Sequence, residues 1–133
     1  MTADGMLTAT AVLKVSRHGA VAIWALDRPE ARNSLSEGLL AALLAETDRA
    51  AQDPAIAAIV IAANGPAFCA GHDLKELSAR RADPDAGAAY FRALMTRCAE
   101  VMQALVNCPK PIIAAVEGVA TATQRDDRGR VTA

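Results

Sequence analysis

The stretch that decides the fold reads Pro66-Ala67-Phe68-Cys69-Ala70-Gly71-His72-Asp73-Leu74-Lys75-Glu76-Leu77. It follows an apolar run, Ile56 to Ala62, and a turn at Asn64-Gly65-Pro66, so it predicts a strand, a tight glycine turn and the start of a helix. Such a turn leaves backbone N–H groups unpaired just before a helix, where they can bind a negative charge on a ligand. If the charge develops during a reaction, the same turn forms half of an oxyanion hole.

The composition limits the classes of partner. The 133 residues favour one domain, and a chain of this length can bury a workable core. A net charge of -1, a pI near 6.1 and an aromatic content of 3% argue against a nucleic-acid-binding surface. No stretch approaches the length of a transmembrane helix, and the N-terminus lacks the pattern of a signal peptide. We therefore expect neither nucleic acid nor a membrane as a partner.

The cysteines indicate a reducing compartment. Cys69, Cys98 and Cys108 are odd in number and widely spaced, without a CxxC pair, so we expect free thiols, a cytoplasmic location and no metal site. Cys69 beside the glycine turn leaves two interpretations open. It is either a small residue packed under the loop or a nucleophile paired with His72, although no third group that would orient such a pair is evident.

Strands and helices are expected to alternate along the chain, which is the pattern of an α/β fold. The predicted helices are a segment of residues 37–52, a short helix of residues 73–81 and a longer helix with one apolar stripe, made of Tyr90, Phe91, Leu94, Met95, Cys98, Val101, Met102 and Leu105. The predicted strands are a hairpin of residues 11–15 and 21–26 turning at residues 16–19, and two strands buried on both faces at residues 56–62 and 112–116.

The composition also predicts three segments of different character. Residues 1–10 are expected to form a flexible N-terminus and residues 11–122 a folded domain. Residues 123–133 are polar and without periodicity, with no bulky apolar residue before Val131, so we expect a disordered tail.

Several motifs, taken in order, resemble the crotonase superfamily of enoyl-CoA hydratases and isomerases. These are Leu26-Asp27-Arg28-Pro29-Glu30-Ala31-Arg32-Asn33-Ser34-Leu35, then Ile59-Val60-Ile61 leading into residues 68–77, and Cys108-Pro109-Lys110-Pro111-Ile112-Ile113-Ala114-Ala115-Val116-Glu117-Gly118-Val119-Ala120. Gly-His-Asp-Leu-Lys-Glu-Leu, together with Ala120-Thr121-Ala122, is most similar to the group called enoyl-CoA hydratase domain-containing protein 3. The resemblance covers about residues 12 to 122.

The resemblance implies a spiral of ββα units and assembly into homotrimers or hexamers. It also implies action on acyl-CoA thioesters in fatty acid metabolism, with coenzyme A as part of the substrate and no separate cofactor. In that family the thioester carbonyl accepts two backbone N–H bonds, which stabilise an enolate-like oxyanion.

The resemblance assigns site residues to the loop after the apolar strand. The N–H of His72 is the expected oxyanion donor, whereas its side chain need not act. The expected substrate-binding residues are Arg28, Ala70, Gly71, Asp73, Leu74 and Lys75. Ala70 would lie against adenine or pantetheine through its backbone, and Lys75 lies either near the CoA phosphates or adenine or simply in solvent. Arg28 either approaches CoA or closes the turn before Pro29, and Asp73 either touches the ligand or caps a helix.

The resemblance stops at Ala122, where Thr123-Gln124-Arg125-Asp126 replaces the family pattern. The second oxyanion donor and the carboxylates of true hydratases are expected beyond this point, and their role is not carried over to Asp126. The alternative to an enzyme is therefore a truncated, non-catalytic remnant, left by a frameshift or premature stop, that at most binds CoA weakly. In that case the apolar sheet edge of residues 112–116 is expected to promote aggregation.

Overall fold

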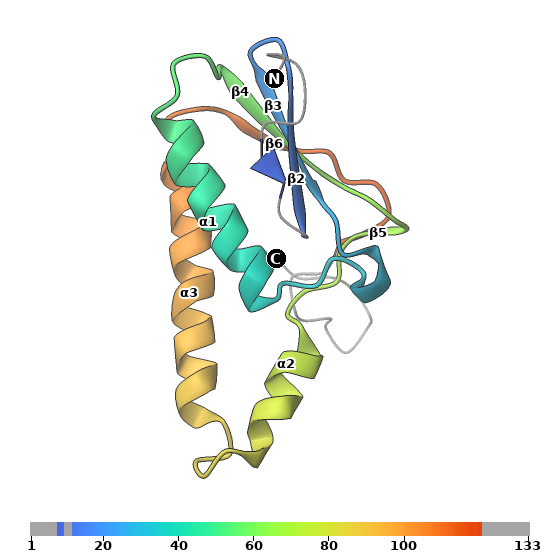
Figure 1. Ribbon diagram of the computed structural model, residues 1–133, viewed down its shortest axis with the longest axis vertical. Helices are drawn as coiled ribbons and strands as arrows, with labels where there is room; N and C mark the ends of the chain where they lie inside the picture. The colour runs from blue at the N-terminus through green and yellow to red at the C-terminus, as the bar shows by residue number, and fades with distance from the viewer. Residues whose placement is uncertain (1–7, 10–11, 121–133) are drawn as a thin grey trace, which may run out of the picture.

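The computed structural model describes residues 8–9 and 12–120 (Figure 1). The expectations for Ala122, for the polar tail of residues 123–133 and for most of the N-terminal segment lie outside this part of the chain. The two described residues of that segment, Thr8–Ala9, form a short strand, β1, that pairs with the sheet.

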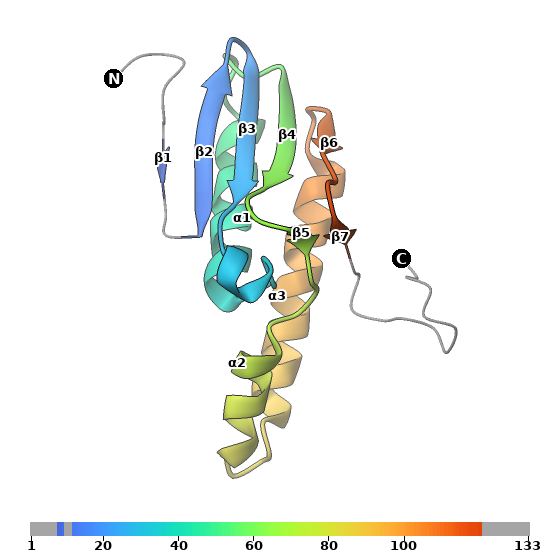
Figure 2. The same cartoon turned by 90° about the vertical axis from the view of Figure 1, so that its right-hand side faces the viewer.

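A five-stranded sheet forms one layer of the fold, in the upper part of the molecule as drawn in Figure 2. Its order is β1, β2 (Leu13–His18), β3 (Val21–Leu26), β4 (Ala58–Ala63) and β6 (Ile112–Ala114). The first three strands are antiparallel, whereas β3, β4 and β6 run parallel. The predicted hairpin is confirmed, but β2 continues through residues 16–18 and the chain turns at Gly19, whose φ is +61°.

Two helices, α1 (Glu37–Ala51) and α3 (Ala88–Asn107), cover one face of this sheet (Figures 1 and 2). Helix α1 begins at Ser36, whose side chain accepts a hydrogen bond from the Leu39 N–H at 3.1 Å. The helix expected over residues 37–52 is thus confirmed. The core between helices and sheet is made of Leu13, Val15, Ala22, Trp24, Leu26, Leu39, Leu40, Leu43, Ala50, Ile56, Ile59, Leu94 and Val101.

The opposite face of the sheet is less covered than the sequence indicated. Ile23, Val60 and Ile113 lie in register on that face, and the first two are only half-buried while Ile113 is 56% exposed. The expectation that both faces of β4 and β6 are buried is therefore wrong for the described residues. The helices form a layer on one side only, and an apolar run by itself does not specify whether a second layer is present.

The apolar stripe of α3 divides in the same way. Leu94 and Val101 are buried against the core, whereas Phe91 and Met102, which the stripe also included, are exposed. Helix periodicity identifies the apolar face of a helix. How much of that face is buried depends on the elements that pack against it.

A second, two-stranded sheet follows the end of β4. It pairs β5 (Ala67–Cys69) in parallel with β7 (Val119–Ala120), and α2 (Leu74–Ala79) begins shortly after β5, followed by a 3₁₀ turn at Arg80–Ala82. Gly118 brings these strands together: its φ is +88°, and a Cβ there would lie 2.2 Å from the Pro66 carbonyl oxygen. The sequence did not indicate β5 as a separate strand, because three residues are too few to show a periodicity. In the described part of the chain, no helix has the length and apolarity needed to cross a membrane.

The uncovered edge of β6 leads to a prediction about association. Ile113, in the edge strand β6 of the described sheet, is 56% exposed, and Val116, which follows that strand, is 52% exposed. An exposed apolar edge strand favours edge-to-edge pairing. We expect the purified chain to self-associate, and Ile113→Lys to shift most of it to smaller species, measured by size-exclusion chromatography with light scattering. Val106→Lys removes an even more exposed apolar side chain from α3, away from the sheet edge, and should leave the distribution unchanged. A monomeric, cooperatively unfolding wild-type chain would contradict the prediction.

Candidate functional site

Asp73 connects the glycine turn to α2. Its Oδ1 accepts hydrogen bonds from the N–H groups of Lys75 at 3.0 Å and Glu76 at 3.2 Å, so the capping role that the sequence suggested is confirmed. Burial by itself raises the pKa of Asp73, but hydrogen bonds from the Glu76 N–H and from Arg28 outweigh it, and the pKa lies below its ordinary value. The carboxylate is therefore charged at neutral pH.

Arg28 forms an ion pair with this carboxylate from the other side. Its Nη2 lies 2.9 Å from Asp73 Oδ2, and its Nη1 donates to the Ser34 carbonyl at 2.7 Å. The two charged side chains are only 17% and 8% exposed. The guanidinium thus links the segment after β3 to the glycine turn, and the two charges neutralise each other.

Asn33 makes a second link that the sequence did not reveal beyond a possible helix start. It is fully buried, its φ is +54°, and its Oδ1 accepts the Arg28 N–H at 2.7 Å. Its Nδ2 donates to the carbonyls of Asn64 and Ala67, both at 2.9 Å. Asparagine tolerates left-handed backbone better than most residues, which is the one signal in the sequence that fits this position.

The glycine turn is held by backbone bonds on both sides of His72. The Leu35 N–H donates to the Gly71 carbonyl at 2.7 Å, and the Asp73 N–H donates to the Leu35 carbonyl at 3.3 Å. The Ala70 N–H donates to the Arg32 carbonyl at 3.0 Å, whereas the His72 N–H has no acceptor within the described part of the chain. Gly71 has a φ of +92°, a conformation that glycine adopts without a Cβ penalty. Within the described residues, the His72 N–H is therefore an unpaired donor in a turn whose backbone is bonded to Arg32 and Leu35.

His72 lies on the wall of an open cavity of about 440 Å³, named here the loop cavity. Its walls are Arg28, Glu30, Ala31, Arg32, Ser34, Ala70, His72, Asp73, Leu74 and Lys75. The structure thus places all the expected site residues on this wall except Gly71, which is buried. The sequence did not single out Glu30, Arg32 or Ser34 as site residues, because they precede α1 and reach the cavity only through the fold.

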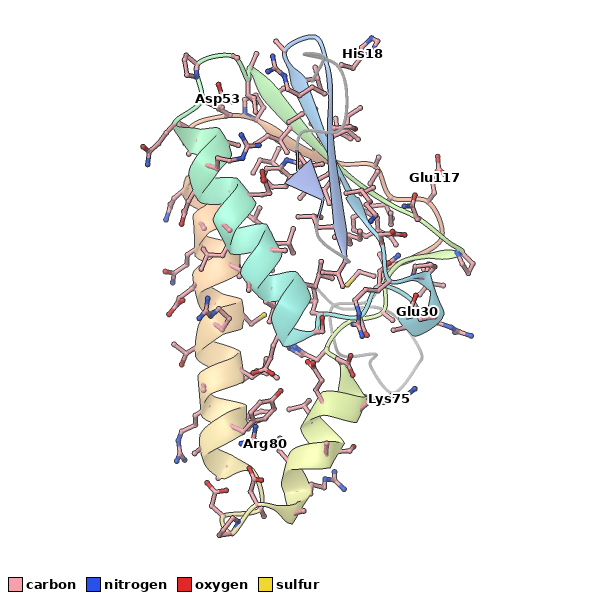
Figure 3. All side chains as sticks on the ribbon, viewed as in Figure 1. His18, Glu30, Asp53, Lys75, Arg80 and Glu117 are labelled. Carbon is pink, nitrogen blue, oxygen red and sulfur yellow. The ribbon has the colours of Figure 1, made fainter. Side chains whose placement is uncertain are left out.

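The charged side chains at the rim of the loop cavity carry an excess of positive charge. Arg32 and Lys75 are exposed cations, and Glu30 is an exposed anion on the 3₁₀ turn Pro29–Ala31. Figure 3 shows Glu30 and Lys75 on the same side of the molecule, on different elements. Since Arg28 and Asp73 neutralise each other, the rim favours an anionic ligand.

A second cavity, of about 460 Å³, lies between α2 and the start of α3 and is named here the helix cavity. Its walls are Leu74, Leu77, Ser78, Arg81, Asp85, Ala86, Gly87, Ala88 and Phe91. Leu74 lines both cavities and is largely exposed. The two hollows are therefore adjacent across one apolar side chain.

The Cys69 thiol lacks the environment of a nucleophile. Burial raises its pKa, against a smaller opposite effect of a hydrogen bond from the Gly71 backbone, so the thiol stays protonated at neutral pH. Its side chain packs against the hydrophobic core, and all three cysteines are free. These properties favour the packing role for Cys69 over the catalytic pair.

The sequence and the fold match known proteins of one family. Residues 16–123 match the family model described as enoyl-CoA hydratase/isomerase. The rat protein named "Enoyl-CoA hydratase domain-containing protein 3, mitochondrial" is 39% identical over 97 residues, which are 73% of this chain and 31% of that protein. The probable enoyl-CoA hydratase EchA14 of Mycobacterium tuberculosis is 36% identical over 82% of this chain and 40% of its own length.

Among solved structures, the enoyl-CoA hydratase of Mycobacterium smegmatis superposes with a TM-score of 0.76 at 44% identity, covering 84% of this chain and 42% of that protein. The chain thus spans less than half the length of each of these relatives. The rat relative is named as mitochondrial, and the cytoplasmic location expected from the cysteines stays a prediction. The family match over residues 16–123 and the shared α/β fold show that this chain belongs to the enoyl-CoA hydratase/isomerase family and has a crotonase-type fold.

Proposed function

We propose that the chain binds acyl-CoA thioesters in the loop cavity and that the thioester carbonyl accepts a hydrogen bond from the His72 N–H. The observation that carries this proposal is that His72 lies on the wall of the loop cavity and that its N–H has no acceptor within the described residues. A donor fixed in advance stabilises negative charge that develops on the carbonyl oxygen, as in an enolate formed during fatty acid metabolism.

The surrounding residues fit the other parts of such a ligand. Lys75 and Arg32, which are exposed cations on the cavity wall, would supply positive charge for the CoA phosphates. Ala70, on the same wall, would contact adenine or pantetheine through its backbone. Leu74 directs the acyl group toward the helix cavity, whose wall contains Leu77 and Phe91. Gly71 provides the backbone conformation of the turn. The expectations of no separate cofactor and no metal, and of a homotrimer or hexamer, stay predictions.

A binding protein without turnover is the second candidate function. Hydration needs a carboxylate that is free to move a proton, and within the described residues the loop cavity offers only Asp73 and Glu30. Both oxygens of Asp73 already accept hydrogen bonds, from Arg28 and from the start of α2. This leaves Glu30 alone, which favours binding over catalysis by this part of the chain.

Labelling with ¹⁵N-histidine tests the proposal directly, because the chain has only His18 and His72. We expect saturating butyryl-CoA to move the His72 backbone amide signal, and to leave His18, exposed at the end of β2, in place. Free CoA should move the His72 amide less, because it lacks the carbonyl. An unmoved His72 amide under saturating butyryl-CoA would contradict the binding mode. Hydration of crotonyl-CoA, followed by loss of absorbance of the conjugated bond, separates an enzyme from the binding protein.

Removing the charge of Lys75 should weaken thioester binding modestly. An exposed charge pair contributes less than about 1 kcal/mol, so Lys75→Ala is expected to raise the Kd of butyryl-CoA about threefold at low salt. The difference should shrink as salt is added, because exposed charges are screened. Isothermal titration calorimetry at two salt concentrations measures both effects. Arg92→Ala removes an exposed cation from α3 outside both cavities and is the control; equal effects of the two variants would argue against a specific contact at Lys75.

A further inference from the structure

Residues 74–86, named here the arm, connect two buried positions without burying any residue of their own. Asp73, which caps the start of α2, and Gly87, which precedes α3, are both buried, and every residue between them is exposed or half-buried. The arm consists of α2, the 3₁₀ turn and the loop that follows. Figures 1 and 2 show it away from the five-stranded sheet, beside the first turns of α3.

Apolar packing contributes little to the position of the arm. Leu77 is its one residue that packs against the hydrophobic core, and it is only half-buried, whereas Leu74 is 71% exposed. Helix α2 has six residues, and isolated helices shorter than about 12–15 residues are marginal in water. Helix α2 therefore depends on the contacts that the arm makes with the rest of the chain.

Glu76 makes the first of these contacts, to the start of α1. Its Oε1 accepts a hydrogen bond from the Glu37 N–H at 2.9 Å. Glu37 is the first residue of α1, so this N–H has no acceptor within its own helix. A carboxylate at the N-terminus of a helix is also favoured by the helix dipole. The bond thus joins the arm to α1, through groups that are exposed to solvent.

Arg80 makes the second contact, to α3. Its guanidinium carbon lies 4.5 Å from the centre of the Tyr90 ring, and its Nε donates to Asp83 Oδ2 at 2.8 Å, which orients the guanidinium from within the arm. Figure 3 shows Arg80 on the side of the arm that faces α3. Burial raises the pKa of the Tyr90 hydroxyl, and the charges of Glu37 and Glu76 raise it further, so the two contacts adjoin each other.

We propose that the arm is a lid that opens by local unfolding, and that Glu76 and Arg80 are the side chains that hold it closed. Exposed contacts of these two kinds are individually weak, and segments with few buried apolar contacts open at a lower free energy than the whole fold. The arm contributes walls to both the loop cavity and the helix cavity, and Leu74 lines both. Opening of the arm therefore widens the access to both cavities.

The glycine turn stays in place while the lid opens. Asp73 remains paired with Arg28, and the Leu35 backbone remains bonded on both sides of His72. The boundary between the fixed and the moving part thus lies at Asp73, where the buried residues end. The lid separates a rigid wall of the loop cavity, which carries the His72 N–H, from a wall that moves.

Hydrogen exchange of the uniformly ¹⁵N-labelled chain, followed by NMR at low urea concentrations, tests the lid without any ligand. The Leu77 N–H donates to the Asp73 carbonyl at 3.3 Å in the arm, and the Leu40 N–H donates to the Ser36 carbonyl at 2.9 Å in α1. We expect exchange at Leu77 to be faster than at Leu40 and nearly independent of urea, because local opening exposes little surface. Exchange at both amides with one rate and one urea dependence would overturn the proposal.

Two substitutions test the side chains that hold the lid. Glu76→Ala and Arg80→Ala are each expected to speed exchange at Leu77 about threefold and to leave Leu40 unchanged. Arg81→Ala is the matched control, because Arg81 is an exposed neighbour without an ion pair or ring contact within the described residues. Unchanged exchange in the first two variants, or equal acceleration in the control, would overturn the assigned roles. Since no thioester is added, this outcome is independent of the proposed function.

Discussion

Replacing Arg28 by alanine is expected to lower the free energy of unfolding by about 3 kcal/mol. The guanidinium is largely buried and bonds Asp73 and Ser34, so its removal leaves the Asp73 carboxylate buried without its cation. Breaking one side of a buried ion pair typically costs about 3–5 kcal/mol, and the lower end applies because the start of α2 still donates to Asp73. Urea unfolding followed by circular dichroism measures the change.

The control for Arg28 is an ion pair at the surface. Arg97 and Glu100 lie 3.9 Å apart on α3, with about half of each side chain exposed. Arg97→Ala should cost less than about 1 kcal/mol, because solvent screens such pairs. Similar losses of unfolding free energy for Arg28→Ala and Arg97→Ala would show that the buried ion pair contributes no more to stability than the surface pair.

Acid should remove the same contribution from the wild type. The pKa of Asp73 is lowered in the folded state, so its ionisation stabilises the fold above its unfolded pKa of about 4 and this stabilisation is lost as pH falls through the lower folded value. The Arg28→Ala variant lacks part of that lowering. Its free energy of unfolding is therefore expected to fall less steeply than that of the wild type between about pH 5 and pH 3.

Replacing Asn33 by alanine is expected to destabilise the fold by a similar amount, on the order of 3 kcal/mol. The substitution leaves the Arg28 N–H and the carbonyls of Asn64 and Ala67 without their partner, and each unsatisfied buried group costs about 1–3 kcal/mol unless water reaches it. Alanine also tolerates the positive φ of this position less well than asparagine. The same urea titration gives the loss.

Two further variants separate the causes at Asn33. Asn33→Gly accepts the backbone conformation and loses only the side-chain bonds, so it should recover no more than about 1 kcal/mol of the alanine loss. Asn64→Ala removes an exposed side chain that bonds Asp27 at 3.1 Å and keeps the carbonyl that Asn33 uses, so its cost should stay below about 1 kcal/mol. Equal free energies of unfolding for Asn33→Ala and Asn64→Ala would show that the three hydrogen bonds of the Asn33 side chain do not stabilise the fold.

Both links act on the segment that presents the His72 N–H. Asn33 holds the entry to β5 through Ala67, and Arg28 holds the exit of the glycine turn through Asp73. Between them, the Leu35 backbone pairs with Gly71 and Asp73. Asn33, Arg28 and Leu35 thus hold the turn that carries the His72 N–H in one position, and a donor fixed in advance is what preorganised electrostatic stabilisation requires.

The sequence patterns that depend on neighbouring residues predicted the elements of the fold well. The hairpin, the two long helices and the cap at Asp73 are confirmed, because each depends on residues within a few positions of one another. Predictions about layers were weaker. The runs at β4 and β6 indicated burial on both faces, yet Ile113 is exposed, because burial depends on whether another layer of the protein covers the strand.

The sequence by itself determined the glycine turn and its position after an apolar strand, since backbone conformation at Gly71 and capping by Asp73 are local properties. The assignment of residues 70–75 to a binding site followed from the family resemblance and stays a prediction. Only the tertiary structure decided what holds that turn. Arg28 is separated from Asp73 by 45 residues, and Asn33 from Ala67 by 34. The packed core decides which distant groups come within hydrogen-bond distance of a charged or polar side chain. Sequence spacing does not contain that information, so it cannot show whether such a side chain faces solvent, a ligand or another side chain.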